Sequence, residues 1–158
     1  RMKINKILII LTFFLLLGCG FEPMYSEKKI DSNYNFKIES IGFSGNNSIN
    51  QYLKNNLLSY TNKKNKEIKY DLVIDSSFVK TITSKNKKGN PEIFAIEITI
   101  YLEIYKAESL INQNTLKENF EYKNKSSRFE LKQYEESIKE NLTSKLSRDI
   151  TQRLYSIK

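Results

Sequence analysis

Apolar and polar side chains alternate most regularly over residues 92–105, which predicts a half-buried antiparallel strand. Weaker alternation over residues 36–43, 70–83 and 115–123 predicts three further strands. The apolar side of residues 92–105 consists of Phe94, Ile96, Ile98, Ile100, Leu102 and Ile104. The opposite side mixes polar residues with tyrosine, so we expect one covered face and one open face.

Two segments carry apolar residues at helical spacing. The first contains Ile49, Tyr52, Leu53, Leu57 and Tyr60, after a turn sequence in which Asn47 or Ser48 can cap a helix. The second, over residues 130–157, repeats every three or four positions: Leu131, Tyr134, Ile138, Leu142, Leu146, Ile150, Leu154 and Ile157. A cofactor-binding helix is one interpretation of this stripe. A helix laid across a sheet is the favoured one.

These elements predict a single α+β domain over residues 36–158, in the order β-α-β-β-β-α. Residues 62–66, 84–91 and 107–114 are the expected loops and turns. Three strands in series form a meander, and the first strand can pair parallel to one of them across its helix. We therefore expect a two-layer sandwich: a small mixed or antiparallel four-stranded sheet with two helices on one face.

The amino-terminal 18 residues have the layout of a signal peptide. Three basic residues precede an uncharged apolar run over residues 7–17, which is too short to span a membrane well. The run ends Leu16-Leu17-Gly18-Cys19, a pattern that resembles the bacterial lipobox. In that interpretation Gly18 gives a peptidase access to the bond before Cys19, whose thiolate accepts a diacylglyceryl group. The alternative is a buried structural cysteine in an ordinary signal anchor.

Lipidation at Cys19 would make residues 1–18 a removable signal and residues 19–35 a lipidated tether. Two or more acyl chains anchor a protein stably to a membrane. Cys19 is the single cysteine of the 158 residues, so no internal disulfide can form, and the chain contains no histidine. Zinc sites are therefore not expected.

Catalytic motifs are missing from the sequence. It has no P-loop, no G-x-G-x-x-G and no G-x-S-x-G elbow, and the commonest general base is absent. Glu135 and Glu136 are adjacent and face different sides of the last predicted helix, so their spacing is not that of a catalytic pair. We expect a protein that is not an enzyme and that holds no cofactor and no metal.

The formal net charge is +8, and lysines gather in two loops. The groups are Lys63, Lys64 and Lys66 after the first helix, and Lys80, Lys85, Lys87 and Lys88 around the first hairpin. Charged loops are usually just solvated, and lysine enrichment can also reflect the codon bias of an AT-rich genome. Nucleic acid is not an expected partner of a secreted, lipid-anchored protein. A phosphorylated, acylated ligand suits lysine ammonium groups better.

The stretch "CGFEPMY", Cys19–Tyr25, resembles the start of the lipopolysaccharide-assembly lipoproteins, the LptE family. Glu22 departs from that pattern, where a basic residue is frequent. The predicted architecture also resembles that of the family. The resemblance implies an outer-membrane lipoprotein on the periplasmic side that plugs, and helps to assemble, the large β-barrel that inserts lipopolysaccharide. It also implies lipopolysaccharide binding near the hairpin, where Lys85, Lys87 and Lys88 lie.

Two other classes of protein remain open. One is an auxiliary lipoprotein of an ABC-type lipid transport system, which would share the anchor and the small α+β domain. The other is a periplasmic enzyme tethered by lipid, which the missing motifs disfavour. Identification of the partners that copurify with the membrane-extracted protein separates these classes.

Overall fold

The computed structural model describes residues 34–62 and 66–157. The signal sequence, Cys19 and most of the predicted tether lie outside the described residues. The elements are β1 (Phe36–Gly45), α2 (Asn47–Thr61), β2 (Ile68–Lys85), β3 (Pro91–Lys106), β4 (Ser109–Lys123) and α3 (Arg128–Ser156). The predicted order and the α+β class are confirmed.

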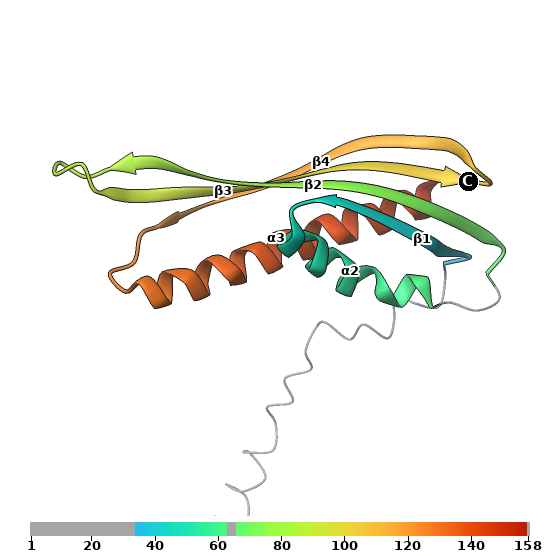
Figure 1. The fold of residues 1–158 in the computed structure, drawn as a ribbon, viewed down its shortest axis with the longest axis horizontal. Helices are drawn as coiled ribbons and strands as arrows, with labels where there is room; N and C mark the ends of the chain where they lie inside the picture. Colours follow the sequence, from blue (N-terminus) through green and yellow to red (C-terminus); the bar gives the residue numbers. More distant parts are fainter. Residues whose placement is uncertain (1–33, 63–65, 158) are drawn as a thin grey trace, which may run out of the picture. The chain divides into compact units, whose positions relative to one another are not determined.

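The four strands form one mixed sheet in the order β1-β2-β3-β4. β1 runs parallel to β2, while β2 and β4 are both antiparallel to β3. Helix α2 therefore makes the crossover that a parallel pair requires. Figure 1 shows α2 and α3 together on one face of the sheet, which confirms the predicted two layers.

The pairing of β1 with β2 shifts register between Ile38 and Ser40. Ile38 lies opposite Tyr70 and is fully buried, whereas beyond the shift Ile41 and Phe43 are the residues packed against the core. One extra residue in a strand reverses which positions face the core. The bulge thus explains why the alternation in this segment changes phase.

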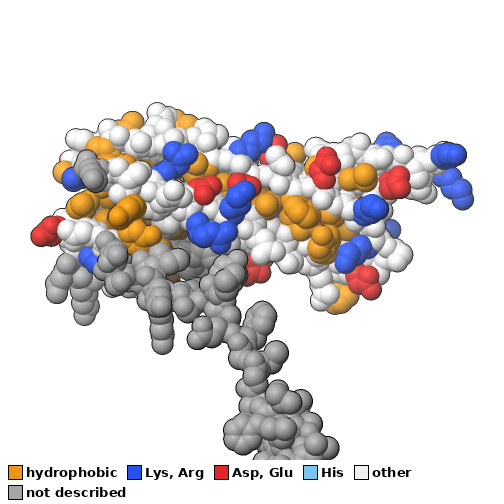
Figure 2. Space-filling model, turned by 180° about the vertical axis from the view of Figure 1, so that it is seen from behind, with side chains coloured by type: hydrophobic (Ala, Val, Ile, Leu, Met, Phe, Trp, Pro, Cys, Tyr) orange, Lys and Arg blue, Asp and Glu red, His pale blue; other side chains and the backbone are white. Residues whose placement is uncertain are grey.

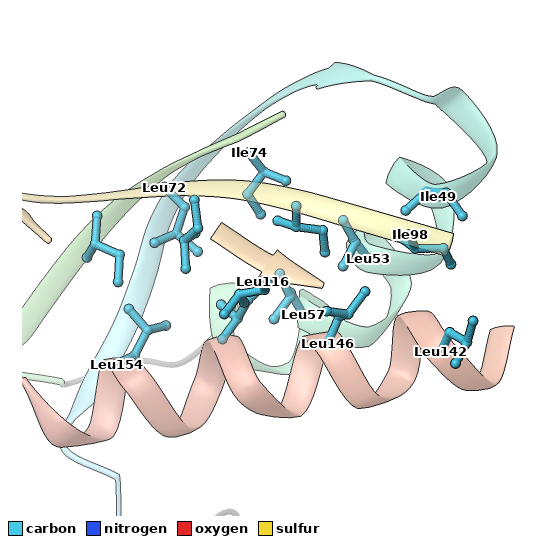
Figure 3. Packing of buried hydrophobic residues seen from close by; sticks show 14 of the residues in the cluster. Ile49, Leu53, Leu57, Leu72, Ile74, Ile98, Leu116, Leu142, Leu146 and Leu154 are labelled. Carbon is cyan, nitrogen blue, oxygen red and sulfur yellow. The ribbon is translucent and has the colours of Figure 1, made fainter. Parts of the chain in front are cut away.

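The core lies between the sheet and the helices (Figure 3). The helix-facing side of β3 contributes a row of five fully buried residues. They are Ile96, Ile98, Ile100, Leu102 and Ile104. Against it pack Ile49, Leu53 and Leu57 of α2 and Leu142, Leu146, Ile150 and Leu154 of α3. Removing these aliphatic side chains from water, at roughly 1.5–3 kcal/mol each, is what holds the layers together.

The predicted turn over residues 107–114 is wrong, because β4 already begins at Ser109. The connection consists of Ala107 and Glu108, both in the left-handed region with φ of 48° and 65°. Asparagine is unfavourable in most strands, which is why this segment did not resemble one, but β4 is an edge strand and edge strands tolerate polar side chains. Here Asn114 pairs with Leu102, and its Oδ1 accepts a hydrogen bond of 2.9 Å from Arg153 of α3.

The cap of α2 is Asn46 rather than Asn47 or Ser48. Its side chain accepts a hydrogen bond of 3.1 Å from the amide of Ile49. Helix α3 starts two residues before the predicted position, because the side chain of Ser127 accepts from the amide of Glu130. In both helices the cap satisfies an amide that has no partner inside the helix.

An aromatic cluster closes the end of the domain where the described chain begins. It consists of Tyr34, Phe36, Tyr60, Tyr70 and Tyr155. The ring centroids of Tyr34 and Tyr155 are 5.0 Å apart, and Phe36 stacks on Tyr60 at 5.9 Å. The Lys66 ammonium donates a hydrogen bond to the backbone carbonyl of Tyr34. The start of β1 is thereby tied to both helices and to β2.

Candidate functional site

Part of the sheet continues beyond the end of β1. β1 stops at Gly45, opposite Ser76, whereas β2 runs on to Lys85. We call this part the arm: residues 77–99 of β2, β3 and their connection, together with the paired residues 117–123 of β4. Figure 1 shows the end of the arm projecting past the first turn of α3.

The arm ends in a short loop organised by Asn86. Its side-chain oxygen accepts hydrogen bonds of 3.0 Å from the amides of Lys88 and Asn90. Its backbone amide donates to the Asn90 carbonyl, and its carbonyl accepts from Gly89, both at 2.9 Å. Gly89 has a φ of +82°, which suits glycine. The four bonds give the loop a defined conformation.

This loop brings together three of the lysines singled out in the sequence. Lys85, Lys87 and Lys88 are all exposed. Within the part of the chain that the structure describes, no carboxylate forms an ion pair with any of them. Figure 2 shows basic side chains gathered at the end of the arm. We call these three residues the lysine tip. Its ammonium groups are available to a phosphate or another anion.

Lys80 does not belong to the lysine tip, although it is close in sequence. As an even-numbered residue of β2 it lies on the helix-facing side, where its Nζ is 4.3 Å from the centre of the Phe94 ring. The same atom forms an ion pair of 2.5 Å with Glu135 of α3. Lys80 is therefore held by Glu135 and the Phe94 ring, although its side chain is still 32% exposed.

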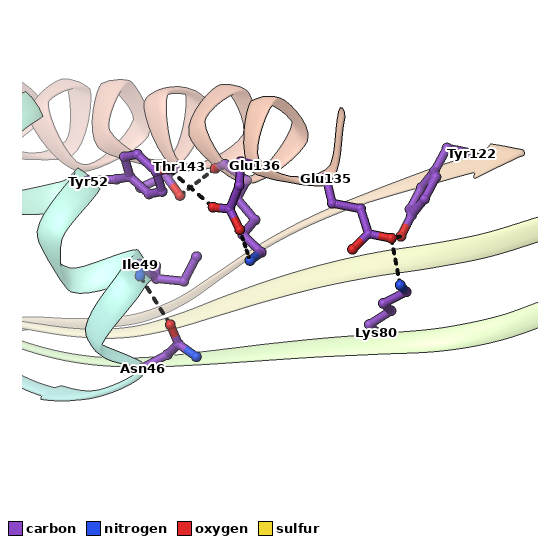
Figure 4. A network of polar contacts seen from close by, with 9 residues as sticks. Asn46, Ile49, Tyr52, Lys80, Tyr122, Glu135, Glu136 and Thr143 are labelled. Carbon is purple, nitrogen blue, oxygen red and sulfur yellow. Dashed lines mark hydrogen bonds and ion pairs between the residues drawn. The ribbon is translucent and has the colours of Figure 1, made fainter. Parts of the chain in front are cut away.

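Glu135 joins α3 to two strands of the arm (Figure 4). Its Oε1 accepts hydrogen bonds from Lys80 Nζ of β2 and, at 2.7 Å, from the Tyr122 hydroxyl of β4. Burial, with the Glu135 hydrogen bond second, raises the pKa of Tyr122 well above its usual range. We call Lys80, Tyr122 and Glu135 the Glu135 junction.

Aromatic rings surround the Glu135 junction. The Tyr122 ring stacks on Phe94 at 5.7 Å and meets Tyr134 edge-on at 5.8 Å. The Glu135 side chain is only 15% exposed, so its charge interacts more strongly than it would in water. Sequence reasoning missed this junction because its members come from β2, β4 and α3. One signal was present, since a lysine in an inward register position needs a partner.

Glu136 makes a separate set of contacts. It accepts from Tyr52 of α2 at 3.3 Å and from Lys139 at 2.8 Å. The Lys139 hydrogen bond holds the pKa of Glu136 below its usual value, against the opposing effect of desolvation. Glu136 thus links the two helices, whereas Glu135 links α3 to the sheet (Figure 4).

Of the three lysines grouped after the first helix, only Lys66 belongs to the described residues. Lys63 and Lys64 lie outside the described residues. Lys66 is directed toward the Tyr34 carbonyl, as described above. Among the described residues, the exposed lysines of the two groups are therefore those of the lysine tip together with Lys80, which is paired with Glu135.

Residues 34–62 and 66–157 contain neither a metal-binding group of side chains nor a membrane-spanning helix. No three His, Cys, Asp or Glu side chains among these residues are grouped so that they could hold a metal ion. No helix in this part of the chain has both the length and the apolar character needed to cross a membrane.

Comparison with known proteins identifies solved structures of similar fold but no matching sequence family. A scan against protein-family models finds no match, and neither does a search of curated protein sequences. Solved structures with a similar fold include bacterial lipoproteins. One is rare lipoprotein B from Shewanella oneidensis, at 10% identity and a TM-score of 0.55, covering 74% of this chain and 94% of that chain.

Two other similar structures have comparable scores. The minor lipoprotein from Acinetobacter baumannii has 17% identity and a TM-score of 0.56, with 76% of this chain and 90% of that chain covered. Lipoprotein B from Nitrosomonas europaea has 13% identity and a TM-score of 0.55, with 77% and 86% covered. At these identities the likeness establishes the β-α-β-β-β-α fold.

Proposed function

We propose that the protein is an outer-membrane lipoprotein that plugs and helps to assemble the β-barrel through which lipopolysaccharide reaches the cell surface. The observation that carries this proposal is the fold, which is shared with solved bacterial lipoproteins, including a rare lipoprotein B. The sequence adds Cys19 at the end of a lipobox-like run, and the family-like stretch that follows it. The anchor would hold the domain at the periplasmic side of the membrane.

The open face of the sheet suits the inside of a barrel. Barrel lumens are polar, so a plug needs a polar surface rather than an apolar one. Ion pairs lie on this face, including Lys117 with Glu97 and Lys37 with Glu39, both at 2.8 Å. The same face also carries a few exposed apolar side chains, among them Val73 and Val79. Such a role requires a compact domain and no catalytic group, in keeping with the absence of catalytic motifs from the sequence.

We further propose that the lysine tip binds the phosphate groups of lipopolysaccharide. Lys85, Lys87 and Lys88 are exposed on a loop of defined conformation at the end of the arm. Lysine ammonium groups meet phosphate as point charges, and exposed charges are screened by salt. Binding should therefore weaken as the ionic strength rises.

Binding is tested with purified lipopolysaccharide and a triple variant, Lys85→Gln/Lys87→Gln/Lys88→Gln. We expect the affinity to fall about tenfold or more and its salt dependence to decrease. The matched control is Lys54→Gln/Lys106→Gln/Lys132→Gln, which removes the same charge from exposed positions elsewhere. An equal loss in both variants would show that net charge, not the lysine tip, governs binding.

The barrel role is tested by depletion of the protein in its host. We expect less correctly folded barrel and less lipopolysaccharide at the surface. Normal levels of both after depletion would contradict the proposal. Affinity purification of the membrane-extracted protein gives a second result, because a single large barrel should copurify. Recovery of an inner-membrane transporter complex instead would favour the auxiliary-lipoprotein class.

A further inference from the structure

The Glu135 junction lies part-way along the arm, where α3 contacts it, and the lysine tip lies at the end of the arm. We infer that Glu135 is a positioning residue, which sets the direction of the arm and so the place of the lysine tip. This inference rests on the proposed function of the tip as a binding site. It assigns to a residue of α3 a role in a site that it does not touch.

Glu135 is placed to control both sides of the arm with one carboxylate oxygen. Lys80 lies on β2 and Tyr122 lies on β4, and both donate to Glu135 Oε1, with β3 between them. A change at this oxygen therefore reaches both strands that flank β3. Because both bonds involve a charged group, each is stronger than a neutral hydrogen bond.

The arm has less support than the rest of the sheet. Beyond Ser76, β2 has no strand on its β1 side, since β1 ends at Gly45 and the chain turns into α2. Lys80 is five residues before Lys85, which at about 3.3 Å per residue places the tip roughly 17 Å from the Lys80 end of the Glu135 junction. Over that length, a rotation of about 10° at the junction moves the tip by ~3 Å.

Loss of the Glu135 carboxylate should free the arm without unfolding the protein. Lys80 is 32% exposed, so without its partner the ammonium can turn toward water. The rings of Phe94, Tyr122 and Tyr134 keep their contacts with one another and retain the local packing. The row of isoleucines in β3 and the leucines of α2 and α3 lie outside the junction.

A second ion pair between the arm and α3 supplies a matched control. Lys145 of α3 and Glu118 of β4 are 2.8 Å apart, and the Lys145 side chain is 54% exposed. This pair holds one strand and not two, and its lysine is largely in water. Glu118→Ala should therefore leave the arm in place, whereas Glu135→Ala should not.

The first experiment measures amide hydrogen exchange by mass spectrometry on the full-length protein in detergent. We expect Glu135→Ala to speed exchange in peptides covering residues 78–95 by about fivefold, with β1 and α2 unchanged. Glu118→Ala should have no such effect, and the exchanged pair Lys80→Glu/Glu135→Lys should restore slow exchange. Unchanged exchange in the arm, or an equal rise everywhere in the domain, would overturn the inference.

The second experiment measures whether the Glu135 junction affects binding, with purified lipopolysaccharide as the probe. We expect Glu135→Ala to weaken binding about fivefold, and to cause no further loss in the chain that already lacks the three tip lysines. An equal loss in both backgrounds contradicts a positioning role. If the tip variant itself binds normally, the proposed function of the tip fails, while the exchange experiment still decides whether Glu135 holds the arm.

Discussion

Gly45 is the residue at which the chain leaves β1 and enters α2. Its φ is +85°, and a Cβ placed on it would lie 2.0 Å from the Ser76 carbonyl oxygen and 2.8 Å from Asp75 Oδ1. The next residue, Asn46, donates its amide to the Ser76 carbonyl at 2.8 Å. The tight approach of two backbones explains why this position requires glycine.

Gly45→Ala should therefore be severely destabilising. The left-handed conformation alone costs about 1–2 kcal/mol, and the clash with a backbone oxygen forces a shift of β1 or β2. Gly89→Ala is the matched control, because Gly89 has a φ of +82° but nothing within 4 Å of its Cβ position. Urea unfolding should show a loss of about 1–2 kcal/mol for Gly89→Ala and clearly more for Gly45→Ala. Equal losses would contradict the role of the close contact.

The two-residue turn between β3 and β4 offers the opposite test. Ala107 and Glu108 both have positive φ, although neither is a residue that favours it. Hairpin turns of this kind favour Asn-Gly. Ala107→Asn/Glu108→Gly should raise the unfolding free energy by about 1 kcal/mol, measured by chemical denaturation. A loss of stability would mean that the present side chains make compensating contacts.

The sequence reveals the role of a residue when that role depends on its neighbours in the chain, and hides it when the partner is distant in sequence. The inward position of Lys80 follows from the alternation in β2, yet its partner is 55 residues away in Glu135. Gly45 gave no signal, because its contact with Ser76 depends on β1 and β2 being neighbours. Cys19, by contrast, is part of a contiguous pattern and needs no fold to be recognised.

At the scale of the elements, the cap of α2 gives a direct test. Asn46 Oδ1 accepts from the Ile49 amide, whereas Asn47, one residue later, is exposed within the first turn. Asn46→Ala should lower the unfolding free energy by about 1 kcal/mol, because the amide loses its acceptor. Asn47→Ala should change it by no more than about 0.5 kcal/mol. The reverse order of losses would place the cap at Asn47.

The link between α2 and α3 should make stability depend on pH. Lys139 lowers the pKa of Glu136 below 4.5 in the folded protein, so the carboxylate stabilises the fold above its unfolded pKa. That contribution is lost as the pH falls through the lowered folded value. Glu136→Gln should lower the melting temperature at pH 7 and flatten its decline below about pH 4.5.

The control for this measurement is Glu92→Gln, at an exposed position of β3. It should leave the acid side of the stability curve unchanged. An acid decline that persists in full in Glu136→Gln would assign the pH dependence to other carboxylates.

An element was easier to predict from the sequence when more of its residues followed one alternating pattern of apolar and polar side chains. β3 places apolar residues at six successive even positions, so its prediction was secure. In β4, residues 109–114 carry two asparagines and a glutamine, and their strand conformation comes from pairing with β3. The bulge of β1 left only a change of phase in the sequence, and its cause is the register shift that places Ser40 opposite Asp71.

At the scale of the whole molecule, lipidation at Cys19 can be tested directly. Cys19→Ser removes the thiolate that would accept the diacylglyceryl group, so we expect incorporation of labelled fatty acid into the protein to be lost. Gly20→Ala, the neighbouring control, should keep the label. Full incorporation of label into Cys19→Ser would contradict lipidation at Cys19.

The candidate site became visible only in the complete fold. The sequence grouped four lysines around one hairpin, and the structure keeps three of them together and pairs Lys80 with Glu135 of α3. That division depends on the pairing of β2 with β3 and on the position of α3, neither of which a run of charges reveals. The positions of Lys85, Lys87 and Lys88 follow from the loop bonds of Asn86.

The aromatic cluster at the start of β1 has a mechanical consequence. Any pull on the chain that precedes Tyr34 acts on this residue before it reaches the hydrogen bonds between β1 and β2. Tyr34 is braced by the ring of Tyr155 and by the Lys66 ammonium, so the load is shared with the end of α3 and with the start of β2. If the domain is tethered to a membrane through the residues before Tyr34, a force along that tether loads the contacts of Tyr34 before it separates β1 from β2.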